Sequence, residues 1–70
     1  MIIAATFTGK NSLGYEHGKD YVLTVLPGGI KSALAIKRTD GTGHCPYRTI
    51  TGFFENWTNI TTNQLCEYTN

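Results

Sequence analysis

The sequence has almost no excess of positive over negative charge. Its 70 residues carry six lysines and arginines against five aspartates and glutamates, which gives a formal net charge of +1. Proteins that bind nucleic acid usually carry a clear basic excess, because neutralising phosphates supplies most of their affinity. The composition therefore does not favour nucleic acid as the partner. A local basic face is still an alternative, because four basic residues lie close in sequence: Lys31, Lys37, Arg38 and Arg48.

Cysteines and long apolar runs are also few. The two cysteines, Cys45 and Cys66, cannot make the disulfide framework that staples small secreted domains. The opening residues, MIIAATFTGK, have no basic region and only a short apolar run, so they predict no signal peptide. No run approaches the length of a membrane span. We therefore expect a cytoplasmic protein with reduced thiols and no membrane partner.

Groupings that carry catalysis or hold metals are missing as well. His44 and Cys45 are neighbours, and neighbours on a strand point to opposite faces, so they are poorly placed to form a thiol–imidazole pair. The remaining possible ligands, His17 and Cys66, do not have the short spacing of structural zinc sites. The five carboxylates are scattered. The sequence predicts no catalytic residue, no metal and no cofactor, and hence a protein that is not an enzyme.

What the sequence has is a series of strand patterns separated by turns. Apolar and β-branched residues predict strands at 2–8, 21–26 and 30–37, and a short fourth strand at 44–47. Pro46 donates no backbone hydrogen bond, so the fourth strand belongs at a sheet edge. Turns are predicted between these strands at Pro-Gly-Gly (27–29) and at Asp-Gly (40–41), whose residues tolerate the required backbone angles.

The segment between the first two strands, residues 9–20, is rich in glycine and polar residues and predicts a long loop. Leu13 and Tyr15 are expected to tuck inward. Loops of this length are uncommon in compact domains and often carry function. We therefore place the candidate binding surface here, on these residues: Asn11, Tyr15, Glu16, His17 and Lys19.

One stretch has helical periodicity. Apolar residues recur at positions i, i+3, i+4 and i+7 and predict a single buried stripe: Ile50, Phe53, Phe54 and Trp57. Thr49 can cap the start of this helix by accepting a backbone hydrogen bond, and Gly52 should limit it to about two turns. Residues 57–61 then predict a final strand with Ile60 facing inward.

This order of elements predicts a mainly β fold with one short helix before the last strand. The architecture expected is a small five-stranded SH3-like barrel or a strongly bent antiparallel sheet. A single domain should cover residues 1–61, followed by a polar C-terminal tail at 62–70. The core is expected to consist of apolar residues from every element except the short fourth strand: Phe7, Tyr21, Leu23, Val25, Leu34, Ile36, Phe53 and Trp57.

Three short motifs lie along the chain: TG-x-x-SLG near the start, G-K-x-Y at the entry to the second strand, and CPY followed by an amphipathic F-x-x-x-W. Their positions are Thr8, Gly9, Ser12, Leu13, Gly14, Gly18, Lys19, Tyr21, Cys45, Pro46, Tyr47, Phe53 or Phe54, and Trp57. Together these motifs resemble those of small phage and prophage proteins with an SH3-like barrel. The resemblance implies an origin in a mobile element and a host cytoplasm as the workplace. It assigns no catalytic residue.

The function expected from these observations is that of a small non-enzymatic interaction protein. It would bind an unidentified host protein and inhibit or modulate it, for example as an anti-defence protein of the anti-CRISPR kind. The alternative is a small barrel that binds nucleic acid or a nucleotide. A monomer and a homodimer are both compatible with the sequence, because a small open barrel leaves strand edges to cover.

Overall fold

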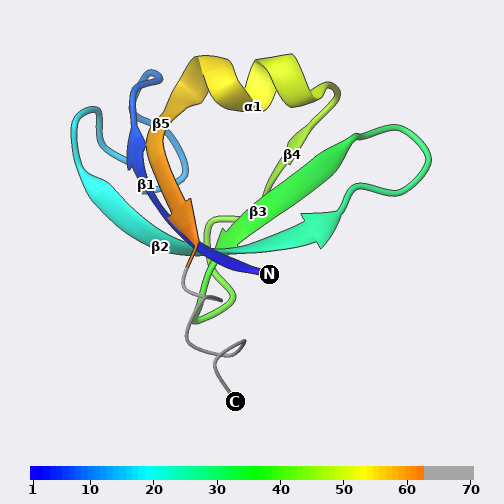
Figure 1. Cartoon of the computed structure of the whole chain (residues 1–70), viewed down its shortest axis with the longest axis horizontal. Coiled ribbons are helices and arrows are strands. Elements are labelled where there is room, and N and C mark those ends of the chain that lie inside the picture. Colours follow the sequence, from blue (N-terminus) through cyan, green and yellow to red (C-terminus); the bar gives the residue numbers. More distant parts are fainter. Residues whose placement is uncertain (63–70) are drawn as a thin grey trace.

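The computed structural model describes residues 1–62 (Figure 1). Its elements are β1 (Ile2–Phe7), β2 (Asp20–Pro27), β3 (Leu34–Arg38), β4 (Cys45–Tyr47), α1 (Ile50–Asn56) and β5 (Trp57–Thr62). The predicted mainly β fold, with five antiparallel strands and one short helix before the last strand, is confirmed. The predicted tail at 62–70 lies outside the described residues except for Thr62, which ends β5.

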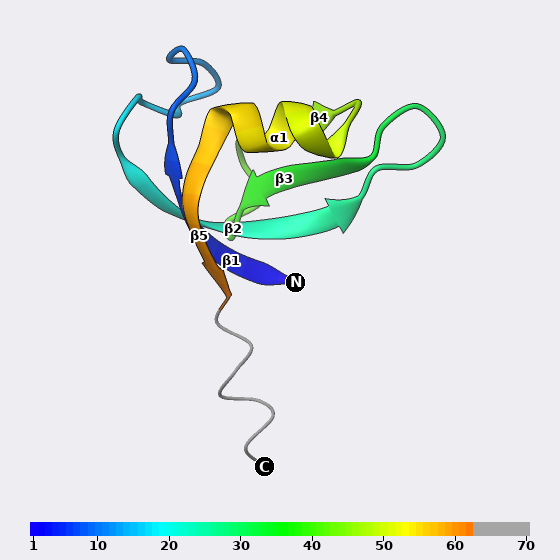
Figure 2. The same ribbon diagram turned by 45° about the horizontal axis from the view of Figure 1, so that its top comes forward.

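The five strands form one sheet in the order β4-β3-β2-β1-β5, with every neighbouring pair antiparallel. The sheet bends into a trough, and α1 lies across the opening between the two edge strands that it connects, β4 and β5 (Figures 1 and 2). β4 occupies an edge, as Pro46 predicts, because its missing N–H would break the ladder of a central strand. The helix thus covers the gap that the sheet leaves open.

Alternation along the strands places the core inside the trough. In β1, Ile3, Ala5 and Phe7 are buried, while the residues between them are half-buried. Leu23 of β2 and Ile36 of β3 have no exposed surface. Five of the eight residues predicted for the core are buried: Phe7, Leu23, Ile36, Phe53 and Trp57. Tyr21, Val25 and Leu34 are half-buried and pack against that cluster.

The predicted apolar stripe of the helix is only half buried, and the prediction is wrong for two of its residues. Phe53 is 5% exposed and Trp57 is 1% exposed, but Ile50 and Phe54 are 56% and 60% exposed. The helix ends at Asn56, so Trp57 already belongs to β5. Thr49 does cap the start, accepting a hydrogen bond from the Gly52 N–H at 3.0 Å. The helix bridges the two edges of a narrow trough, so only the side chains on its underside contact the core.

The third strand begins at Leu34, four residues later than predicted, and Ile30 is fully exposed in the loop at 28–33. The two glycines explain the shift. Gly29 has a φ of +85°, and Gly28 lies so close to the carbonyl of Ser32 that a Cβ atom would not fit between them. A wide loop therefore replaces the first half of the expected strand. Within the shortened strand, Ala35 and Ile36 are both buried.

Candidate functional site

The loop at residues 8–19 is fixed to the fold at its base and closed at its tip. At the base, the Thr8 N–H donates to the Asn56 carbonyl at 2.7 Å, at the end of α1. At the tip, Ser12 and Tyr15 exchange backbone hydrogen bonds of 2.8 and 3.1 Å. Leu13 stands at the corner of that turn with a φ of 54° and is 54% exposed, so the prediction that it tucks inward is wrong.

Tyr15 anchors this loop in the core. Its ring lies 5.2 Å from the Trp57 ring and 5.7 Å from the Phe7 ring, measured between centroids. Its hydroxyl donates to the Gly43 carbonyl at 2.8 Å. Burial raises the pKa of Tyr15, and the charge of Arg38 opposes that rise. Tyr15 is 2% exposed, so the prediction that it tucks inward is confirmed. The prediction that it also belongs to the exposed binding surface of the loop is wrong.

Arg38 is engaged in contacts within the fold. Its guanidinium carbon lies 4.3 Å from the centroid of the Tyr15 ring, in cation–π geometry. The same guanidinium donates to the Leu13 carbonyl at 2.7 Å and to the Thr42 hydroxyl at 3.1 Å. Arg38 therefore joins the tip of the loop at 8–19 to the turn that follows β3.

The four basic residues proposed as one face are not brought together. Arg38 pairs with the buried Leu23, so it faces the inside of the trough, whereas Lys37 is its strand neighbour and faces the outside. Lys31 lies in the loop before β3 and Arg48 directly after β4, both near the start of β3. Three residue steps of strand, roughly 10 Å at the usual rise, separate Leu34 at that end from Lys37.

The other predicted loop residues are exposed and lie near one another. The Asn11 side-chain oxygen accepts from the His17 backbone N–H at 2.8 Å, and His17 Nδ1 lies 3.2 Å from the Gly9 carbonyl. Lys19 and Glu16 form an ion pair of 3.1 Å. The hydrogen bond and charge of Glu16 hold the pKa of Lys19 above its ordinary value. These groups largely satisfy one another and shape the loop.

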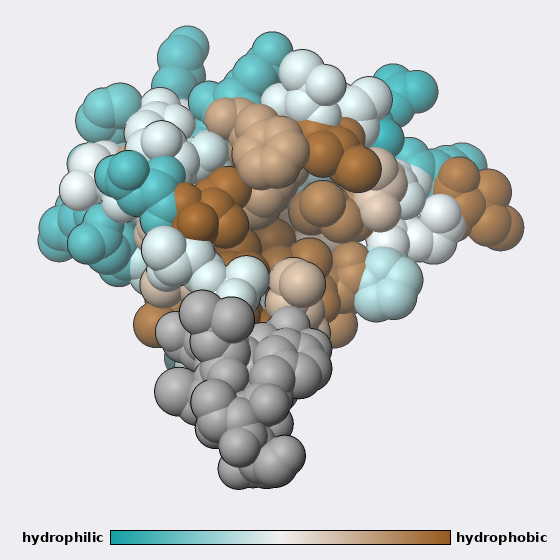
Figure 3. Space-filling view, in the orientation of Figure 1, coloured by the Kyte–Doolittle hydropathy of each residue, from teal (hydrophilic) through white to brown (hydrophobic). Residues whose placement is uncertain are grey.

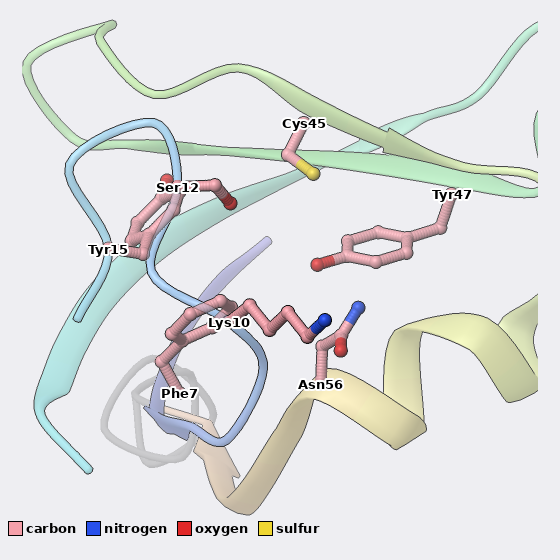
Figure 4. A pocket seen from close by; sticks show the side chains of 7 residues that line it. All are labelled: Phe7, Lys10, Ser12, Tyr15, Cys45, Tyr47 and Asn56. Carbon is pink, nitrogen blue, oxygen red and sulfur yellow. The ribbon is translucent and has the colours of Figure 1, made fainter. Parts of the chain in front are cut away.

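A pocket of about 430 Å³ lies between the loop at 8–19, β4 and the end of α1 (Figure 4). It is lined by residues from both halves of the chain: Phe7, Lys10, Ser12, Tyr15, Cys45, Tyr47 and Asn56. The sequence interpretation missed this pocket. Its residues form two groups that are far apart in the chain, and no motif spacing connects them.

Tyr47 gives the pocket a fixed hydrogen-bond donor. The Trp57 Nε1–H donates to the Tyr47 hydroxyl oxygen at 2.9 Å within the core. An indole N–H can only donate, so the Tyr47 oxygen accepts here and its own proton is available to another group. Burial raises the pKa of Tyr47, and the hydrogen bond from Trp57 opposes that rise. The hydroxyl therefore stays protonated at neutral pH.

The other lining groups also favour donation. The ends of Lys10, Tyr47 and Asn56 point toward one another in Figure 4. Lys10 is the single charged residue of the lining, and within residues 1–62 no ion pair or hydrogen bond engages its ammonium group or the Ser12 hydroxyl. Cys45 contributes a thiol, but no histidine lines the pocket beside it. The arrangement suits binding of a polar group that accepts hydrogen bonds.

Two further observations bound the chemistry of the described chain. Within residues 1–62, no three side chains among histidine, cysteine, aspartate and glutamate come close enough to hold a metal ion. No helix of that part has the length and apolar character needed to cross a membrane.

No family model, curated protein or solved structure matches the chain.

Proposed function

We propose that this chain is a non-enzymatic interaction domain of phage or prophage origin that binds a host protein and inhibits or modulates it. The observation that carries the proposal is the pair of exposed apolar side chains on α1, Ile50 and Phe54. They lie four residues apart and so occupy the same face of the helix. Apolar side chains gather below α1, at the centre of the face seen in Figure 3.

This helix face resembles the centre of a protein interface in two respects. Large aromatic side chains dominate binding energy in interfaces, and exposed apolar patches on soluble proteins commonly mark contact sites. In addition, the Phe54 ring packs against the buried Phe53 ring, with 5.4 Å between centroids. That contact restricts Phe54 before any partner arrives, which lowers the entropy lost on binding.

The origin and the host partner rest on the resemblance of the short motifs to phage and prophage proteins. Two of those motifs have a clear structural purpose here. The SLG motif forms the tip of the loop at 8–19, where Gly14 has a φ of +82°. The CPY motif forms β4 and supplies Cys45 and Tyr47 to the pocket. The shared motifs thus shape one region of the surface, next to the helix.

The proposal is tested by capture from a host lysate with three immobilised proteins: the unchanged chain, Phe54→Ser, and the control Ile30→Ser. Ile30 is fully exposed and belongs to the loop at 28–33, not to α1. A host protein should be retained by the unchanged chain and by the control but lost with Phe54→Ser. With that protein purified, we expect Phe54→Ser to weaken its affinity by about thirtyfold, the loss typical of an aromatic hot spot.

The captured protein must also change its activity when the unchanged chain is added. Retention of the same proteins by all three baits would contradict the proposal. So would recovery of nuclease-sensitive nucleic acid alone, which would favour the alternative of a nucleic-acid-binding barrel. The separation of Lys31, Lys37, Arg38 and Arg48 over two ends and two faces of β3 does not favour that alternative.

A further inference from the structure

We propose that the pocket between the loop at 8–19 and the end of α1 binds a carboxylate group of an acidic peptide segment. Among the described residues, none that lines the pocket is acidic, and the ammonium group of Lys10 has no carboxylate partner. A group of opposite charge that also accepts hydrogen bonds would complement this lining. A carboxylate has that chemistry, with two oxygens and about four acceptor sites.

The donors around the pocket are of the kind that a carboxylate requires. The Tyr47 hydroxyl has its oxygen occupied by Trp57 and so presents its proton. Ser12 contributes a hydroxyl and Asn56 an amide, and both line the same cavity as Lys10. Hydrogen bonds from a cation and neutral donors to a carboxylate are about twice as strong as those between neutral groups. Together these residues can surround one carboxylate.

The fold positions the elements that carry these donors before a ligand arrives. The hydrogen bond from Trp57 holds the Tyr47 hydroxyl, and the paired backbone bonds with Tyr15 hold the backbone of Ser12. The Asn56 carbonyl accepts from Thr8, which keeps the end of α1 against the base of the loop. Prior placement of this kind raises affinity because less order is lost on binding. The side chains of Lys10, Ser12 and Asn56 must still settle.

The cavity has room for more than the charged group. Its volume of about 430 Å³ falls in the range of small-ligand pockets. Phe7 and Tyr15 add aromatic walls, which suit the methylene groups that carry a carboxylate in a peptide. The segment bound is either an acidic side chain or a chain end, since both present the same group.

This inference rests on the proposed function, because the peptide segment would belong to the partner protein, but it has its own test without a host protein. The chain contains one tryptophan, so its indole N–H gives a single NMR signal. That N–H donates to Tyr47, whose hydroxyl faces the pocket, so a carboxylate that binds Tyr47 should shift the signal. The experiment titrates the full chain with short peptides and follows this signal.

Two matched pairs of peptides distinguish the sources of the carboxylate. Acetyl-Gly-Glu-Gly-amide is compared with acetyl-Gly-Gln-Gly-amide, and acetyl-Gly-Gly with a free carboxyl end is compared with its amide. We expect a saturable shift with the glutamate peptide, the free-acid peptide or both, and none with their neutral counterparts. The Lys10→Gln variant should bind about tenfold more weakly, as expected for one lost charged hydrogen bond.

Lys31→Gln is the control, since Lys31 carries the same charge but does not line the pocket. It should bind as the unchanged chain does, and the remaining amide signals should show that both variants are folded. The inference is overturned if carboxylate peptides at millimolar concentration leave the indole signal unmoved. Equal shifts with the neutral peptides, or equal weakening by Lys31→Gln, would also overturn it. None of these results bears on capture through Phe54, so the two proposals fail separately.

Discussion

Two adjacent phenylalanines on α1 should respond very differently to the same substitution. Phe53 is 5% exposed and belongs to the core cluster, whereas Phe54 is 60% exposed. Replacing Phe53 with alanine removes a buried ring that packs edge-on against Tyr47, with 5.6 Å between centroids. Deletions of buried phenylalanine typically cost about 3–5 kcal/mol of the free energy of unfolding. Because Phe54 is largely in water, Phe54→Ala should cost less than about 1 kcal/mol.

The size of the first loss matters because the domain is small. At the usual stability per residue, a chain of this length has a total free energy of unfolding of about 4–10 kcal/mol. Phe53→Ala should therefore remove a large part of it, and Phe53→Leu, which leaves a smaller cavity, should fall between the two. Trp57 is unchanged in all three variants and is buried against the same core, so its fluorescence reports unfolding in guanidinium chloride.

The midpoint of unfolding should fall strongly for Phe53→Ala and hardly at all for Phe54→Ala, with far-ultraviolet circular dichroism giving the same midpoints. Equal losses from the two alanine variants would refute the assignment of one buried and one exposed ring. A larger loss from Phe54→Ala would refute it more strongly. It would also remove the basis for a binding surface on that face of α1.

Two further predictions concern the contacts around Tyr15 and Tyr47. Gly43 has a φ of +72°, and a Cβ atom there would lie 2.7 Å from the Tyr15 hydroxyl oxygen, so Gly43→Ala should cost about 1–3 kcal/mol. Gly41→Ala, at a φ of +91° with nothing near its Cβ, should cost less in the same denaturant titration, and an equal cost would contradict the contact. Burial raises the pKa of both Tyr15 and Tyr47 above the ordinary value of about 10, so the folded state binds protons more tightly than the unfolded state. Their contribution is complete below pH 10 and is lost as the pH rises above it. The melting temperature should therefore fall there, and less steeply in Tyr47→Phe than in the unchanged chain; equal slopes would exclude Tyr47 as a cause.

Local patterns predicted the elements of this fold well. The apolar and β-branched run at 2–8 predicted β1, and the missing N–H of Pro46 placed β4 at an edge. Thr49 caps α1 as its position before the apolar stripe indicated. Each of these follows from the residue itself and its nearest neighbours, so the sequence was sufficient.

The misses have a different cause, because each depends on what lies opposite a residue in space. Helical periodicity groups Ile50 and Phe54 with Phe53, but it cannot show that a helix across an opening has partners for only part of its stripe. The pocket depends on the approach of the loop carrying Lys10 to the strand carrying Tyr47. No spacing within either segment indicates that approach.

The position of β1 between β2 and β5 has a consequence for the synthesis of the protein. Ile3 and Phe7 pair with Thr62 and Trp57, so the first strand made finds its second neighbour only when the last strand has been made. Until then, a nascent chain exposes one edge of IIAATF, an uncharged and strongly β-favouring segment of the kind that aggregates. Contacts between such distant segments also slow folding. Aggregation during translation should therefore depend on how quickly residues 57–62 leave the ribosome.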